Sequence, residues 1–75
     1  MDIGMLWLDD DKKRSLAEKV TIAADYYQSK YGQIPELCLV NKKMLEQECQ
    51  VGEIKVLPVR NVLPNHFWVG MNNPI

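Results

Sequence analysis

The first third of the chain alternates apolar and charged blocks, and this pattern predicts a strand followed by a helix. Residues 5–8 are a short, wholly apolar run that is typical of a buried strand. Apolar residues then recur every three or four positions, which predicts one long helix over about residues 12–31. Gly32 is placed to end this helix in a left-handed conformation, and Pro35 prevents helix from resuming. The apolar stripe of the helix consists of Leu16, Val20, Ala23, Ala24, Tyr27 and Tyr31.

A second strand and a short second helix are predicted next. Residues 37–40 form another run that is apolar on both faces, as in a strand buried on both sides. Asn41 is a good helix-capping residue, so we expect a short helix over residues 42–48. Met44 and Leu45 would be its buried positions.

The last third predicts two more strands. Residues 54–57 alternate in polarity as a third strand does, and Pro58 marks a sheet edge or a strand end. The dipeptide Pro64-Asn65 is a good turn pair, and residues 67–69 then predict a fourth strand. Residues 70–75 are expected to be a flexible or packing tail.

The order of elements is therefore β-α-β-α-β-β, which predicts an α/β fold, with α+β as the alternative. A strand, a long helix and another strand form a right-handed parallel crossover by default, so we expect a parallel β-α-β start. We expect one two-layer domain over residues 1–75, with the long helix packed on a sheet of three or four strands. The third and fourth strands are placed to pair with each other through residues 58–65.

Composition restricts the functional classes without identifying one. The chain has 75 residues and a mass of 8.7 kDa, and 47% of its residues are apolar while 25% are charged. These are the proportions of an ordinary globular domain. The net charge of −1 does not supply the strong basic field of a dedicated nucleic-acid binder, so nucleic acid is not an expected partner. No apolar run approaches the roughly 18 residues that span a bilayer, and we expect a cytoplasmic protein without a membrane partner.

The run Asp9-Asp10-Asp11 is the first candidate for chemistry. It follows the first strand, at the sheet end where open α/β folds place their ligands, and carboxylates suit Mg²⁺ or Ca²⁺. Aspartates also cap helices, and the next three residues are basic and balance the charge. We favour capping, with Asp10 or Asp11 as the N-cap, and we predict no metal.

Thiol and imidazole groups form the second candidate. Cys38, Cys49 and His66 could in principle form a thiol–imidazole pair or a three-ligand zinc site. Neither reading has a supporting spacing motif, and Cys38 lies inside an apolar run where a reduced core thiol is the ordinary interpretation. We therefore predict no catalytic residue and no cofactor.

The number of elements available to cover the two faces of the sheet is more informative than these candidate chemical groups. Two strands that are apolar on both faces need cover on both faces, and one long helix with one short helix cannot provide it. Ile22 and Tyr26 form a small second stripe outside the main stripe of the long helix. Either residues 67–75 or another protein chain must cover the remaining surface. The candidate interface residues are Ile22, Tyr26, Trp7 and Trp68.

These observations predict a non-enzymatic association or accessory module that acts as a homodimer or as a subunit of a larger complex. One alternative is a small metal-dependent enzyme that uses the Asp9, Asp10 and Asp11 carboxylates. The second alternative is a nucleic-acid accessory domain, whose contacts would come from Lys12, Lys13, Arg14 and Arg60.

Overall fold

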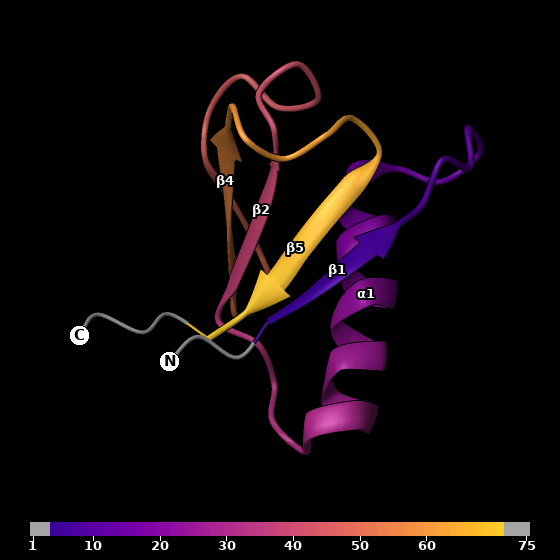
Figure 1. The fold of residues 1–75 in the computed structure, drawn as a ribbon, viewed down its shortest axis with the longest axis vertical. Helices are drawn as coiled ribbons and strands as arrows, with labels where there is room; N and C mark the ends of the chain where they lie inside the picture. The colour runs from indigo at the N-terminus through magenta and orange to yellow at the C-terminus, as the bar shows by residue number, and fades with distance from the viewer. Residues whose placement is uncertain (1–3, 72–75) are drawn as a thin grey trace.

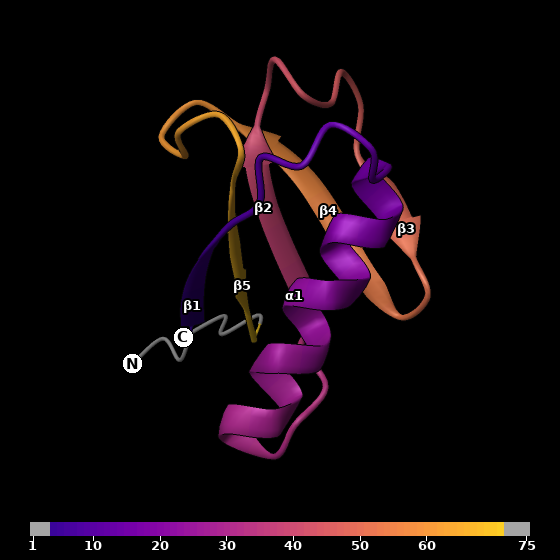
Figure 2. The same cartoon turned by 90° about the vertical axis from the view of Figure 1, so that its right-hand side faces the viewer.

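The computed structural model, which describes residues 4–71, has a mixed sheet of five strands and one helix, and the fold class is α+β. Figures 1 and 2 show two views of it. Among the described residues no helix is long and apolar enough to cross a membrane. The elements in chain order are β1 (Gly4–Leu8), α1 (Leu16–Tyr31), β2 (Leu37–Asn41), β3 (Cys49–Val51), β4 (Ile54–Val59) and β5 (His66–Gly70).

The strand order across the sheet is β1-β5-β2-β4-β3. β5 lies between β1 and β2 and is antiparallel to both, while β2 and β4 are parallel and β3 is antiparallel to β4. As Figure 1 shows, β1, β2 and β4 run one way and β5 runs the other. The expected pairing of the last two strands is wrong because β2 separates β4 from β5. β1 and β2 run in the same direction, as a β-α-β start requires, but they are not neighbours.

The predicted short helix is absent from the structure. Asn41 instead forms a turn: the Lys43 amide donates to Asn41 Oδ1 at 2.8 Å, and the Met44 amide donates to the Asn41 carbonyl at 2.9 Å. Such local side-chain hydrogen bonds compete with helix, and a segment of about seven residues gains too little from helix formation to win. Met44 and Leu45 are half-buried and pack against the core, and β3 follows as a strand that sequence analysis does not predict.

The helix begins later than predicted, and its N-cap is Ser15. The Glu18 amide donates to Ser15 Oγ at 3.1 Å, and the Ser15 amide donates to the Glu18 carboxylate at 3.0 Å, which is a complete capping box. The expected N-cap, Asp10 or Asp11, is therefore wrong. At the other end the prediction is confirmed, because Gly32 caps the helix with a φ of 75°.

The turns and the end of the chain follow the sequence more closely. Asn65 has a φ of 66°, and the His66 amide donates to the Leu63 carbonyl at 3.1 Å, which closes the predicted turn. Pro58 lies in β4 beyond the residues that pair with β3, so β4 has a strand on one side only at this position. Gly70 is buried and ends β5, so it does not belong to a tail; residues 72–75 lie outside the described part.

The core lies between α1 and one face of the sheet, and Figure 2 shows the helix in front of that face. Successive strand residues point to opposite faces, so every second residue enters the core. Val20 and Tyr27, on the predicted helical stripe, are fully buried. We call this side of the sheet the helix face, and its buried strand residues are Cys38, Val40, Ile54, Val56, Phe67 and Val69.

Candidate functional site

The opposite side of the sheet carries apolar side chains with no helix over them among residues 4–71. Leu6 pairs across to Trp68, and Trp68 pairs in turn to Leu39, so these three side chains lie in one row. Leu8 and Leu37 extend the same surface along β1 and β2 because they are two residues away from members of that row. We call this side the open face. Its apolar centre together with His66 comprises Leu6, Leu8, Leu37, Leu39, Leu57, His66 and Trp68, and the same register places Lys55 and Gln50 on this side at the β4–β3 edge.

Three large apolar side chains on and beside the open face are more exposed than is usual for leucine. Leu6 is 63% exposed, Leu8 is 58% exposed, and Leu63 in the loop before β5 is 68% exposed. A hollow of about 660 Å³ lies between that loop and the sheet. Its apolar lining includes Leu39 and Trp68, and its polar lining consists of Asn61 and His66. This mixture of an apolar floor with a few polar groups is typical of a surface that receives a partner.

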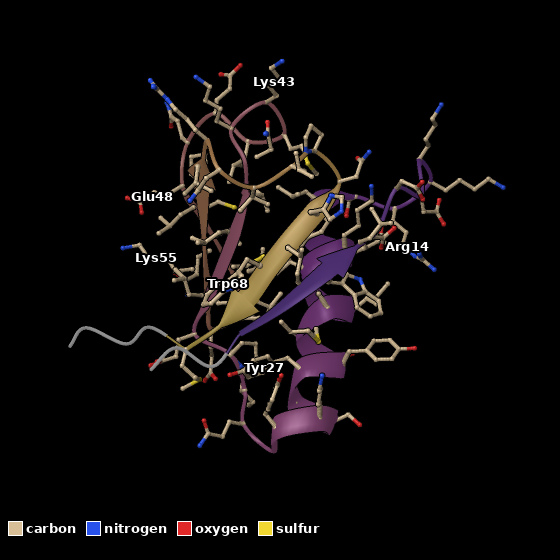
Figure 3. All side chains as sticks on the ribbon, in the orientation of Figure 1. Arg14, Tyr27, Lys43, Glu48, Lys55 and Trp68 are labelled. Carbon is tan, nitrogen blue, oxygen red and sulfur yellow. The ribbon has the colours of Figure 1, made fainter. Side chains whose placement is uncertain are left out.

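Gly4 determines where the Trp68 indole lies. A side chain at residue 4 would overlap the Trp68 ring, so the glycine allows the ring to lie against the start of β1. This placement leaves Trp68 half-buried on the open face, between Leu6 of β1 and Leu39 of β2. Figure 3 labels Trp68 beside β5. A flat aromatic ring at the centre of an exposed apolar surface is the residue type that most often anchors protein–protein contacts.

The rim of the hollow is held by Asn41. Its side-chain amide donates to the Val62 carbonyl at 2.8 Å, while its side-chain oxygen accepts from the Lys43 amide at 2.8 Å. The Asn65 amide also contacts Met44 Sδ at 3.1 Å. One side chain therefore fixes the loop after β2 to the loop before β5, so the hollow has a shape before any partner arrives.

His66 lies on the open face, and its Nδ1 is 2.9 Å from the Pro64 carbonyl. Because a carbonyl can only accept, Nδ1 must carry the proton in this contact. Nε2 then remains available to a partner. His66 is therefore an open-face residue whose ring is held by a turn carbonyl.

The four predicted interface residues lie on different sides of the sheet. Trp68 is on the open face, whereas Trp7 is on the helix side of β1 and stacks on Tyr26 with ring centroids 4.4 Å apart. Tyr26 is still 56% exposed and Ile22 is half-buried. Trp7 Nε1 is buried without a hydrogen-bond acceptor among the described residues. Part of the second helical stripe is thus used within the chain, and it is not continuous with Trp68.

The three aspartates organise the segment that leads into α1. Asp9 Oδ1 accepts from the Asp11 amide at 3.0 Å, and Asp11 Oδ1 accepts from the Lys13 amide at 2.8 Å. Arg14 Nη1 lies 3.4 Å from a carboxylate oxygen of each of these two aspartates. No group of three or more His, Cys, Asp or Glu side chains in the 4–71 segment is arranged to hold a metal ion.

The thiol and imidazole groups do not converge. Cys38 and Cys49 are free and both are aligned with Val56 on the helix side, whereas His66 is on the open face. Burial, together with the neighbouring Cys49 thiol, raises the pKa of Cys38 to about 12. A thiol with this pKa is protonated at neutral pH and is a poor nucleophile.

The candidate nucleic-acid contacts are also separated. Arg14 is engaged by two aspartates, and Arg60 follows β4, which β5 and β2 separate from β1. Lys12 and Lys13 are exposed in the segment after β1.

Comparisons with protein-family models, with curated proteins and with solved structures gave no match.

Sequence reasoning identifies an uncovered sheet face but not most of its residues. Leu6 with Leu8, and Leu37 with Leu39, are two residues apart and therefore share a strand face, which was the available signal. Leu63 has no such signal, because its exposure depends on a loop that only the fold positions.

Proposed function

We propose that this protein is a non-enzymatic association module that forms a homodimer in which two open faces cover each other. The observation that carries the proposal is the exposure of Leu6 and Leu8 beside Trp68 on a sheet face that has no helix over it among residues 4–71. Monomeric proteins seldom leave such a continuous apolar surface in water.

The area that a dimer needs supports this proposal. A stable interface takes about 800 Å² from each partner, which is roughly one sixth of the 5218 Å² surface of the chain. One face of a two-layer domain can supply that share. A second copy also satisfies the symmetry of a two-fold contact, in which each residue on the open face contributes twice.

A small domain gains stability from such a contact. A chain of this size buries a smaller part of its surface than a larger one, so its margin of stability is narrow. Each leucine that becomes covered contributes about 1.5–3 kcal/mol. Dimerisation would therefore stabilise the fold as well as join two subunits.

The experiment compares Leu6→Lys with Ile34→Lys by sedimentation equilibrium of the full chain over micromolar concentrations. Leu6 is 63% exposed on the open face, whereas Ile34 is 50% exposed in the connection that leads from α1 to β2, so both tolerate lysine in the monomer. We expect the parent to dimerise, Leu6→Lys to weaken the dimer about 100-fold because a charge enters an apolar contact, and Ile34→Lys to behave as the parent.

A parent chain that stays monomeric at high micromolar concentration would contradict the proposal. A parent dimer that Leu6→Lys does not weaken would place the interface elsewhere.

A further inference from the structure

The outer edge of β1 has no strand beside it in the 4–71 segment. β1 stands at the end of the strand order and pairs with β5 on its inner side. In Figure 2, β1 is the leftmost strand, and no described helix or strand lies beyond it. Residues 4–8 include no charged residue and no proline, which are two of the means by which proteins keep a sheet edge from pairing. This edge is therefore open to a further strand.

One hydrogen bond shows which backbone groups of β1 point outward. The Asp9 amide donates to the Asn65 carbonyl at 2.9 Å, so the backbone of Asp9 is directed toward β5. Directions alternate along an antiparallel ladder, so Met5 and Trp7 also direct their amides and carbonyls toward β5. The residues whose amides and carbonyls point to the outer edge are Gly4, Leu6 and Leu8.

The opposite edge of the sheet is less suited to pairing. β3 has three residues, whereas β1 has five. Glu48, immediately before β3, lies 3.5 Å from Lys55 in an ion pair, and the exposed Gln50 donates from its side chain to the Gly52 carbonyl at 3.2 Å. A short edge with charged and polar side chains discourages a partner strand. The two edges therefore differ, and β1 is the one that favours pairing.

The strand that fits this edge is β1 of a second copy, running antiparallel and centred on Leu6. In this register Leu6 lies opposite Leu6 of the second copy and Gly4 lies opposite Leu8, so each outward amide faces an outward carbonyl. The contact is two-fold and closes on itself. Pairing of β1 with β3 of another copy would match only three residues and would leave an unpaired edge at each end of the assembly.

The side chains of β1 also match in this register. Gly4 has no side chain, and the Trp68 ring occupies the space in which one would lie. Leu8 is 58% exposed, and in the second copy it comes beside this ring because it lies opposite Gly4. On the helix side, Met5 lies opposite Trp7, and both are half-buried in the single chain. Apolar pairs directly opposite each other are a main source of stability between strands.

We propose that the outer edge of β1 pairs with the same edge of a second copy, antiparallel and centred on Leu6, to form one continuous sheet across two chains. The two-fold axis of this contact is perpendicular to the sheet, so the open faces of both copies lie on the same side. The inference goes beyond the proposed function, because it uses backbone groups at the edge and leaves the open face free for stacking. A chain that uses both contacts assembles beyond the dimer. Edge pairing involves one short strand, so it requires a higher protein concentration than the open-face contact.

The experiment blocks one outward amide without changing any side chain. The full chain is made by chemical synthesis with a methyl group on the Leu6 backbone nitrogen, while the Met5 and Trp7 amides that face β5 are unchanged. Sedimentation equilibrium is measured from micromolar to millimolar concentration. We expect the unmodified chain to form species larger than a dimer and the methylated chain to stop at the dimer. The dissociation constant of the larger species should rise at least about tenfold, because two symmetric hydrogen bonds are lost.

Methylation of the Gln50 backbone nitrogen is the matched control at the other edge. The Lys55 amide donates to the Glu36 carbonyl at 3.0 Å, so Lys55 faces the β2 side of β4. Gln50 is paired with Lys55, and the two members of such a pair point away from each other, so the Gln50 amide points outward from β3. We expect this variant to assemble as the unmodified chain does. A loss as large as that from Leu6 would overturn the pairing of β1 with itself in favour of a head-to-tail contact between β1 and β3.

Leu39→Lys separates this inference from the proposed function. Leu39 is half-buried on the open face of β2, and β5 lies between β2 and β1, so the new charge enters the open face and leaves the edge unaltered. It should remove the open-face contact and leave edge pairing, with circular dichroism as the check that the variant is folded.

The outcomes are distinguishable. Assembly that methylation of Leu6 leaves unchanged would overturn this inference and leave the proposed function intact. A dimer that survives Leu39→Lys in full but is lost on methylation of Leu6 would support this inference and overturn the proposed function. A parent that stays monomeric over the whole concentration range would overturn both.

Discussion

The two faces of the sheet are both apolar, yet only one is buried within the chain. Phe67 and Trp68 are neighbours in β5, and Phe67 is fully buried under α1 whereas Trp68 is half-buried on the open face. Val40 is likewise fully buried, while the adjacent Leu39 is half-buried. The chain thus has enough apolar surface for two cores and, in its described part, one helix to cover it. The difference teaches that one face stabilises the monomer, whereas the other contributes little to it and is the face that the proposed function assigns to association.

The residue types on the two faces differ in a way that suits these roles. The helix face is rich in valine, including Val40, Val56 and Val69, which is stiff at χ1 and packs closely on a strand. The open face instead carries leucines and one tryptophan, which are longer and reach away from the sheet.

The largest effect is expected when the two faces are compared by alanine substitution at two adjacent positions of β5. Phe67→Ala should lower the free energy of unfolding by about 3–5 kcal/mol, because it leaves a cavity in a fully buried site. Trp68→Ala should cost less in the monomer, since that residue is only partly buried, but should weaken the proposed dimer. Urea unfolding at low protein concentration measures the first effect, and sedimentation measures the second. Equal losses of monomer stability would show that the two faces do not differ as described.

A smaller effect is expected from Gly4→Ala. The new methyl group overlaps the Trp68 ring, so the indole must move, and the overpacking should cost about 1–3 kcal/mol. Tryptophan fluorescence in a Trp7→Phe background reports the movement, because Trp68 is then the remaining tryptophan. The double variant Gly4→Ala with Trp68→Leu should recover most of the loss. If it does not, the cost comes from the β1 backbone and not from the ring.

The smallest effect concerns pH and the helix face. Burial raises the pKa of Cys38 from its ordinary value of 9.0 to about 12. The unfolded chain therefore loses this proton first, so stability is complete below about pH 9 and falls as the pH rises toward 12. Between pH 7 and 9.5 we expect a loss of about 1 kcal/mol, measured by urea unfolding before tyrosines ionise. Cys38→Ala should remove this slope, and an unchanged slope would assign it to another group.

Local signals in the sequence predict much of the fold. Each apolar run assigned to a strand becomes one, and Gly32 ends the long helix as predicted. The middle of the predicted helical stripe, Val20 to Tyr27, is buried, whereas Tyr31 at its end is 37% exposed. The N-cap is misassigned although its signal is present, because Ser15 and Glu18 have the spacing of a capping box. The carboxylates of Asp9 and Asp11 each accept a hydrogen bond from the backbone amide two residues later. Aspartate favours such turns as well as helix N-caps, so the residue type alone does not distinguish the two roles.

Long-range pairing is the part that sequence reasoning does not supply. Nothing near residues 66–70 shows that this strand enters between β1 and β2, since pairing depends on the whole sheet. The candidate site is divided for the same reason. Strands that are apolar on both sides make an uncovered face predictable. The stacking of Trp7 on Tyr26, which places both rings on the helix side, depends on the three-dimensional fold and has no signal in the sequence.

The central place of β5 has a consequence for how the chain folds. Within residues 4–71, β1 pairs with β5 alone, and their partner residues are about sixty positions apart in the chain. While the first half is being synthesised, the strand that lies between β1 and β2 and pairs with both is still missing. β4 can join β2 earlier, through the β3–β4 hairpin, but the sheet stays in two pieces until β5 enters. Pairing over such long separations is slow, and the chain exposes unpaired strands while it waits. We therefore expect the rate-limiting step of folding to be the insertion of β5, and a nascent chain lacking this strand to be prone to aggregation.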